Sequence, residues 1–176
     1  AAADLEIQPM LIAPMARSAN AYLDYNKLYA DGKLEVGAQF GWDYNAGRAD
    51  LANAEQLYDE LVAIGFASPV SAFANLKLDS APLTRAGTYN GKPVKITLKL
   101  VHPGMVASPA ADAVKLREAL LALLATKEVV LFNGHAGVSG RLLPADFRST
   151  SAGNILPAEY ATMPPTRKVC GCGFLP

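Results

Sequence analysis

The 176-residue sequence has no excess of charge of either sign, because sixteen Lys and Arg residues balance sixteen Asp and Glu residues. It also lacks a basic tract interleaved with aromatic residues, so we expect no nucleic-acid partner. No apolar run approaches the roughly 20 residues that a membrane-spanning helix needs, and we therefore expect no membrane span. A composition of 51% hydrophobic and 18% charged residues is typical of a globular chain.

Cysteine and histidine are scarce, with two of each. Cys170 and Cys172 are one residue apart, and such a pair rarely has the geometry of a mutual disulfide. Two histidines and scattered acids show no metal-ligand spacing, so we expect no metal and no cofactor. The sequence begins with Ala1, Ala2, Ala3 and Asp4, without the features of an intact signal peptide. A mature end left by signal cleavage would mean a secreted or periplasmic protein, whereas an arbitrary fragment end explains the same residues.

The first half of the chain predicts mixed helices and strands. A helix is expected over residues 18–30, followed by a half-exposed strand over 34–40 with a period of two. Asp50 is a good N-cap for an amphipathic helix over residues 51–64. Residues 67–90 are rich in Ser, Ala, Pro and Gly and show no strong period. We therefore expect an N-terminal part (1–66), a boundary or linker (67–90) and an α/β part (91–176).

The clearest pattern is strand, helix, strand over residues 93–133. Apolar and polar residues alternate after the Asn90-Gly91 turn, and a leucine stripe follows Ser108-Pro109. A helix of this length returns the chain to the same edge of the sheet, so the two strands should be parallel. The fold class predicted is α/β with a partly parallel sheet. After residue 141 we expect loops, one helical turn near 158–162, and a tail with too few apolar residues for a core strand.

The second strand of this unit leads into the segment with most potential for chemistry. Four apolar residues, Val129 to Phe132, predict a short buried strand, and Asn-Gly-His-Ala-Gly follows at residues 133–137. Binding and catalytic groups gather beyond the carboxyl ends of parallel strands, where His135 would act as a general base. Alternatively, residues 133–137 form a plain turn whose histidine satisfies a backbone carbonyl. We interpret His102, beside Pro103, as structural.

A base at His135 needs a nucleophile from another part of the chain. The candidates are two cysteines and three serines: Cys170, Cys172, Ser139, Ser149 and Ser151. No Gly-x-Ser-x-Gly elbow occurs, which disfavours a serine hydrolase of the α/β-hydrolase kind.

The strand ending in Asn-Gly-His-Ala-Gly resembles the histidine half of the caspase-like cysteine peptidases, a group that includes caspases, legumain-type and gingipain-type enzymes. Residues 93–160 are similar to uncharacterised secreted bacterial proteins sharing this loop. In the peptidases the histidine follows one strand and the nucleophilic cysteine follows the neighbouring strand. The resemblance implies that His135 is the general base, that Cys170 or Cys172 is the nucleophile, and that Gly134, with Gly137 in the same loop, serves the oxyanion. The expected partner is then a peptide or protein substrate.

A second reading is a non-catalytic secreted module used for binding or adhesion. Five aromatic residues of the N-terminal part would then contact a partner such as a glycan: Tyr22, Tyr25, Tyr29, Trp42 and Tyr44. Core packing explains the same residues without any such function.

Overall fold

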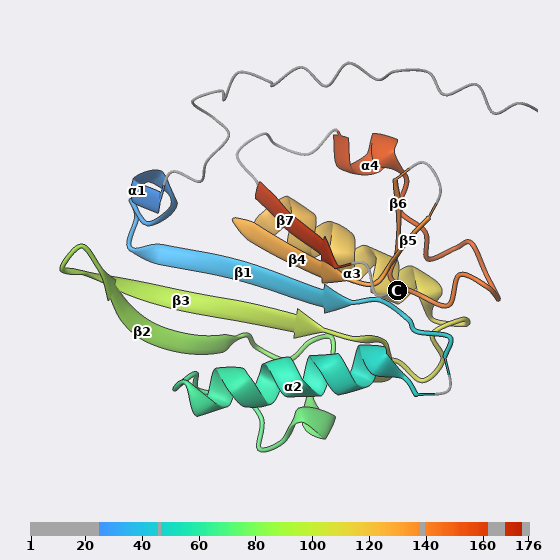
Figure 1. Cartoon of the computed structure of the whole chain (residues 1–176), viewed down its shortest axis with the longest axis horizontal. Helices are drawn as coiled ribbons and strands as arrows, with labels where there is room; N and C mark the ends of the chain where they lie inside the picture. The colour runs from blue at the N-terminus through green and yellow to red at the C-terminus, as the bar shows by residue number, and fades with distance from the viewer. Residues whose placement is uncertain (1–24, 46, 138–139, 162–167, 174–176) are drawn as a thin grey trace, which may run out of the picture.

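The computed structural model describes residues 25–45, 47–137, 140–161 and 168–173, with the backbone alone for residues 136, 161 and 168–173. Its centre is a five-stranded sheet of order β2-β3-β1-β4-β7, in which β2 is antiparallel and the other four strands are parallel (Figure 1). The strands of this sheet are β1 (Lys33–Phe40), β2 (Leu83–Tyr89), β3 (Lys92–Val101), β4 (Val129–Asn133) and β7 (Lys168–Gly173). The predicted α/β class with a partly parallel sheet is confirmed.

Two long helices cover the sheet, one on each face (Figure 1). α2 (Ala49–Ala63) connects β1 to β2 and packs Ala54, Tyr58 and Leu61 into one core. α3 (Ala113–Thr126) connects β3 to β4 and packs its leucines into the other core. The shorter elements are α1 (Tyr25–Leu28), η1 (Phe73–Asn75), η2 (Pro103–Met105), β5 (His135–Gly137), β6 (Arg141–Leu143) and α4 (Pro157–Ala161). The two predicted long helices and the short helical turn are confirmed, whereas most of the expected helix 18–30 lies outside the described residues.

β1 is the central strand, which differs from the half-exposed strand expected. All five residues from Val36 to Phe40 are buried. Val36 and its alternate neighbours face α2, whereas Gly37 and Gln39 face α3. A Cβ on Gly37 would lie 2.8 Å from a methyl group of Leu123, so only glycine allows α3 to pack this closely. Gly37 and Gln39 therefore lie at a close contact with α3 and not on a solvent-exposed face of the sheet.

The predicted crossover over residues 93–133 is confirmed, with β3 and β4 parallel, but the two strands are not adjacent. β1 lies between them, and Val36 pairs with Leu98 on one side and with Val129 on the other. The sheet therefore combines strands from both sides of residues 67–90. That segment itself supplies β2 and the buried Leu76 and Leu83, so the expected linker does not fit the structure.

Two further strand expectations are corrected at the outer edge of the sheet. Residues 168–173, predicted to form no core strand, form the edge strand β7 beside β4. An edge strand is held by backbone hydrogen bonds along one side and needs fewer apolar residues than a central one. β4 was expected to be fully buried, yet Leu131 is 39% exposed. The loop-like reading of residues 141–165 also missed β6, which pairs with β5 in a two-stranded ribbon.

Candidate catalytic site at the carboxyl ends of the parallel strands

The order of the strands creates a switch point between β1 and β4. From β1 the chain passes through α2 and the β2–β3 hairpin to β3 on one side, then through α3 to β4 on the other. Loops leaving β1 and β4 thus diverge, and a crevice for ligands is typical of this position in open α/β sheets. The segments that leave here are residues 41–45 and 134–137.

Two glycines bring these segments into contact. A Cβ on Gly134 would lie 2.9 Å from the Cα of Gly41, and a Cβ on Gly41 would lie 2.8 Å from the carbonyl oxygen of Leu143. The Gly41 amide donates a 2.8 Å hydrogen bond to the Asn133 carbonyl. Side chains at either glycine would push the backbones apart, so this pair holds the residues that follow in one place.

The imidazole of His135 lies in an aromatic setting that leaves it accessible. Its ring stacks on Tyr44 at a centroid distance of 4.9 Å and meets the edge of Phe147 at 5.2 Å. The side chain is 29% exposed. The alternative expectation was a plain turn in which His135 donates to a backbone carbonyl. No such hydrogen bond is present among the described residues. The ring is therefore held in orientation by packing and remains open to solvent on part of its surface.

Asp43 is the charged neighbour of this ring. Its Oδ1 lies 4.0 Å from Nε2 of His135, beyond hydrogen-bond range but close enough for electrostatic interaction. The carboxylate accepts hydrogen bonds from the amides of Asn45 (3.0 Å) and Ala49 (3.1 Å) and from the Asn45 side chain (2.8 Å). Burial raises the pKa of Asp43, but the backbone hydrogen bonds and the charge of His135 outweigh burial and hold it below the ordinary value. Asp43 is thus a fixed, buried negative charge beside the imidazole.

Asp43 also performs the capping role that we predicted for Asp50. α2 begins at Ala49, whose amide bonds to the Asp43 carboxylate, and the N-cap residue is Arg48, with φ 46°. Asp50 is buried in the first turn, where it accepts two 2.8 Å hydrogen bonds from the guanidinium of Arg48. These bonds raise the pKa of Arg48. Arg48 lies over the ring of Trp42 at 3.9 Å, which fixes the start of α2 against the site.

His102 follows β3 but does not belong to the open site. It is 4% exposed, stacks on Phe73 at 4.5 Å, and neither ring nitrogen has a hydrogen-bond partner among the described residues. Burial lowers the pKa of His102 to about 4, with Asp50 opposing and Arg48 assisting the change. His102 is therefore a neutral core residue, in agreement with its structural interpretation.

The cysteines lie on β7, the neighbour of β4, which is the strand that leads into His135. In the parallel register, Val130 pairs with Val169 and Phe132 with Cys172. Cys170 and Gly171 therefore oppose Leu131 alone, which makes a bulge in β7. Bulges redirect side chains and are frequent beside active sites. The side chains of Cys170 and Cys172 lie outside the described part of the structure.

The serine candidates are less well placed. Ser139 lies outside the described residues. Ser149 donates a 2.7 Å hydrogen bond from its hydroxyl to Asp146, and its neighbour Ser151 is exposed. No hydrogen bond from either hydroxyl to His135 is present among the described residues.

The two glycines expected to serve the oxyanion, Gly134 and Gly137, both lie in the described part of the structure. The Gly134 amide makes no hydrogen bond to another described residue, and Gly137 pairs with Arg141 between β5 and β6.

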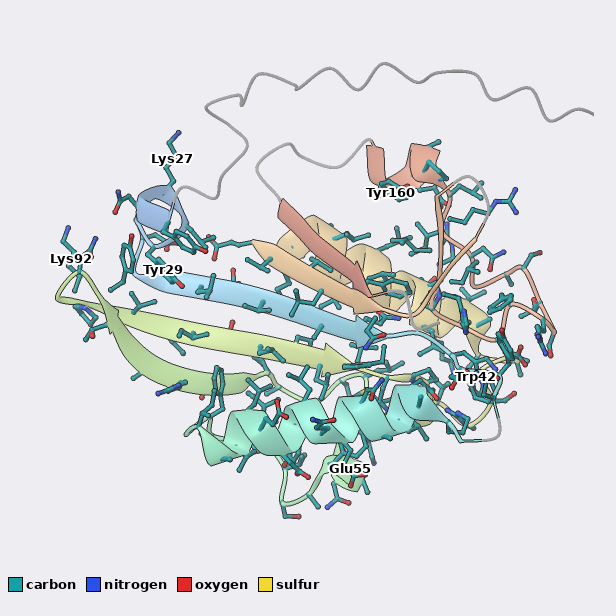
Figure 2. The ribbon with its side chains drawn as sticks, in the orientation of Figure 1. Lys27, Tyr29, Trp42, Glu55, Lys92 and Tyr160 are labelled. Atoms are coloured by element: carbon teal, nitrogen blue, oxygen red, sulfur yellow. The ribbon has the colours of Figure 1, made fainter. Side chains whose placement is uncertain are left out.

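The aromatic residues of the N-terminal part divide between the two ends of β1. Tyr29 lies near its amino end, where it stacks on Tyr25 and on Tyr89, and Trp42 lies beyond its carboxyl end (Figure 2). Tyr44 packs between His135 and Arg148, whose guanidinium lies 3.6 Å from the tyrosine ring centroid. Tyr22 lies outside the described residues. The five aromatics therefore do not form one surface.

Sequence reasoning missed Asp43 and Phe147, and it named Tyr44 only as an aromatic residue for partner binding, without placing it beside His135. The one available signal was the segment Gly41-Trp42-Asp43, which follows a strand in the same way as Gly134-His135.

Comparisons with protein-family profiles, with curated proteins and with solved structures found no match to this chain. In the part of the chain that the structure describes, no three His, Cys, Asp or Glu residues are grouped to hold a metal ion. Nor does any helix there have the length and apolar character to cross a bilayer.

Proposed function

We propose that this protein is a hydrolase of the cysteine-peptidase type, secreted or periplasmic, in which His135 is the general base and Cys170 or Cys172 the nucleophile. The observation that carries the proposal is the order of the strands. His135 follows β4, and both cysteines lie on β7, the parallel neighbour of β4. Caspase-like peptidases, which the Asn-Gly-His-Ala-Gly segment resembles, distribute the same two residues over neighbouring strands.

Asp43 supplies a reason for His135 to act as a base. The buried carboxylate of Asp43 lies 4.0 Å from Nε2, and this leaves Nδ1 to receive a proton from the nucleophile. The aromatic contacts with Tyr44 and Phe147 restrict the rotation of the ring. Preorganised side chains of this kind are what a proton transfer at neutral pH requires.

The reaction follows the usual course of thiol hydrolases. His135 takes the thiol proton, the thiolate sulfur attacks the peptide carbonyl, and the carbonyl oxygen becomes an oxyanion. The Gly134 amide, which has no protein partner in the described structure, is available to donate to that oxygen. The imidazolium then returns its proton to the leaving amine, and water hydrolyses the thioester that remains. In that second stage His135 takes a proton from the attacking water and returns it to the departing thiolate, so the enzyme ends in its starting state.

The proposal is tested by peptide hydrolysis with the full chain. A mixed peptide library, analysed by mass spectrometry, should show cleavage by the wild type and its loss in His135→Ala. One of Cys170→Ala and Cys172→Ala should lose activity and the other should keep it. Asp43→Asn should retain a folded protein with a reduced rate and a changed pH profile. Cleavage that persists in the double cysteine variant would contradict the proposed nucleophile.

The second candidate is the non-catalytic binding module, and one observation favours it. Tyr25 is 52% exposed and continues the stack of Tyr29 and Tyr89 at the amino end of β1. A groove of about 410 Å³ beside that stack is lined by Tyr29, Tyr89 and Arg85. Exposed tyrosine faces suit sugar rings or peptide side chains. A folded protein without hydrolase activity, whose binding to a glycan array is lost in Tyr29→Ala, would favour this reading.

A further inference from the structure

A lysine lies where the strand pattern predicts a solvent-facing side chain. Lys99 belongs to the polar face of β3, but it pairs with Gly37 of β1, whose face is covered by α3. The polar face of β3 therefore passes beneath α3 at this point. Lys99 is only half exposed, and burial lowers its pKa, as does the charge of Lys127, while Asp79 acts in the opposite direction.

Among the described residues, no carboxylate is in contact with the ammonium group of Lys99. Its Nζ donates hydrogen bonds to the carbonyl oxygens of Leu78, at 2.7 Å, and Ser80. Asp79 is exposed and lines a neighbouring cavity instead. An ammonium has three donors, so these two neutral acceptors leave one donor open, and the negative charge of Asp79 acts on the ammonium only from beyond contact distance. A partly buried charge of this kind favours a negative partner.

Next to this ammonium is a cavity of about 290 Å³ between α3 and residues 78–82. Its walls are mainly apolar, with Val101 and Leu123 beneath and Ala119 and Ala122 along the helix. Lys127 stands at the same cavity, with a side chain 19% exposed, and it is paired with Glu35 at 3.2 Å. Two ammonium groups thus border an apolar space, and within the described part of the chain only that of Lys127 contacts a carboxylate.

We propose that this cavity binds a small amphipathic carboxylate, such as a short-chain fatty acid, with its carboxylate on Lys99 and its alkyl chain along α3. Apolar walls with one or two placed polar groups are typical of small-molecule sites, and the volume is at the lower end of their range. Ser80 lines the same cavity, and its hydroxyl, which accepts a hydrogen bond from the Lys77 amide, keeps its own hydrogen to donate to the carboxylate. The cavity is separate from the His135 site, so this proposal stands or falls independently of the hydrolase.

The test is an NMR titration of the full chain with hexanoate, compared with hexan-1-ol and with acetate. Hexanoate should cause saturable shifts at the amides of Val101, Ala119 and Leu123. Hexan-1-ol has the chain without the charge and loses one charge-assisted hydrogen bond, whereas acetate has the charge but lacks four buried CH2 groups. Both should therefore bind at least about ten-fold more weakly. Equal affinity for hexanoate and hexan-1-ol, or the absence of saturable shifts, would overturn the proposal.

Three variants sharpen the result. Lys99→Met keeps an unbranched side chain one atom shorter and removes its charge, so the Kd for hexanoate should rise about ten-fold or more. Ala122→Leu should block the cavity sterically while leaving Lys99 in place, and it decides the matter if Lys99→Met does not fold. Lys115→Met is the matched control, because Lys115 is exposed on the same helix and lines a different cavity. An unchanged Kd in both Lys99→Met and Ala122→Leu would refute the assigned site.

Discussion

Replacing His102 should remove a dependence of the stability on pH that the fold otherwise has. The imidazole is buried, neither nitrogen has a partner among the described residues, and the ring stacks on Phe73. His102→Phe therefore removes no hydrogen bond and keeps a planar ring in the stack. The imidazole packs close to Gly104, where an added Cβ would lie 3.1 Å from Nδ1, so His102→Leu is a second variant in case the larger phenyl ring does not fit.

The size of the effect follows from the pKa of His102. Burial lowers it from 6.5 to about 4 in the folded protein, so between these values the unfolded chain binds a proton that the folded chain does not. The free energy of unfolding then decreases as the pH falls through this window, by about 1.4 kcal/mol for each pH unit of difference. The full loss at pH 4 is about 3 kcal/mol, and above pH 6.5 His102 contributes no pH dependence.

Urea unfolding at a series of pH values between 4 and 7.5 measures this effect. Carboxylates such as Asp43 add their own acid dependence, so the informative quantity is the difference between wild type and variant at each pH. The free energy of unfolding of His102→Phe should increase relative to that of the wild type as the pH falls from 6.5 to 4. Parallel curves for the wild type and His102→Phe would refute the account of a neutral buried imidazole.

Two further substitutions test the packing around the candidate site. Gly134→Ala should lower the free energy of unfolding by about 1–3 kcal/mol, because the new Cβ would lie 2.9 Å from the Gly41 backbone, whereas Gly47→Ala, with open space, should change it by less than about 0.5 kcal/mol. Equal unfolding midpoints for the two variants would show that the segments are not in close contact. Asp50→Ala should cost about 1–3 kcal/mol, since it leaves the guanidinium of Arg48 without its two hydrogen bonds, and the exposed Asp59→Ala on the same helix provides the baseline. If both aspartate variants unfold at the same urea concentration, the ion pair has no stabilising role.

The elements that the sequence predicted well are those with a strong local period. The leucine stripe of α3, the stripe of α2 and the alternation of β3 each identify the element without any knowledge of its neighbours. Asn90 and Gly91, with φ of 49° and 74°, adopt the left-handed conformation that the turn signal implies. Local patterns of this kind do not depend on which strand lies next to which.

The expectations that failed depended on tertiary contacts. β1 looked half-exposed because glycine and glutamine alternate with its apolar residues, and only the position of α3 shows that both are buried. β7 lacks an apolar pattern because it is an edge strand held by β4. The boundary at 67–90 was inferred from composition, which does not show that β1 lies between β3 and β4.

The candidate site shows the same division. His135 was found from a strand followed by a glycine-rich loop, which is a local signal. Asp43 lies 92 positions earlier in the sequence and reaches the imidazole through the contact between Gly41 and Gly134. A single sequence does not reveal a pairing of this separation, because it arises from the order of strands in the sheet.

The most direct test of the central claim is the rate of alkylation of each cysteine as a function of pH. Iodoacetamide labelling of Cys170 and Cys172, mapped separately by mass spectrometry from pH 5 to 10, reports the pKa of each thiol. A dyad with His135 predicts that one thiol titrates well below the ordinary value of about 8.5 and returns toward it in His135→Ala. Two thiols that both titrate near 8.5 and do not respond to His135→Ala would contradict the proposed pairing of β4 and β7 as a catalytic site.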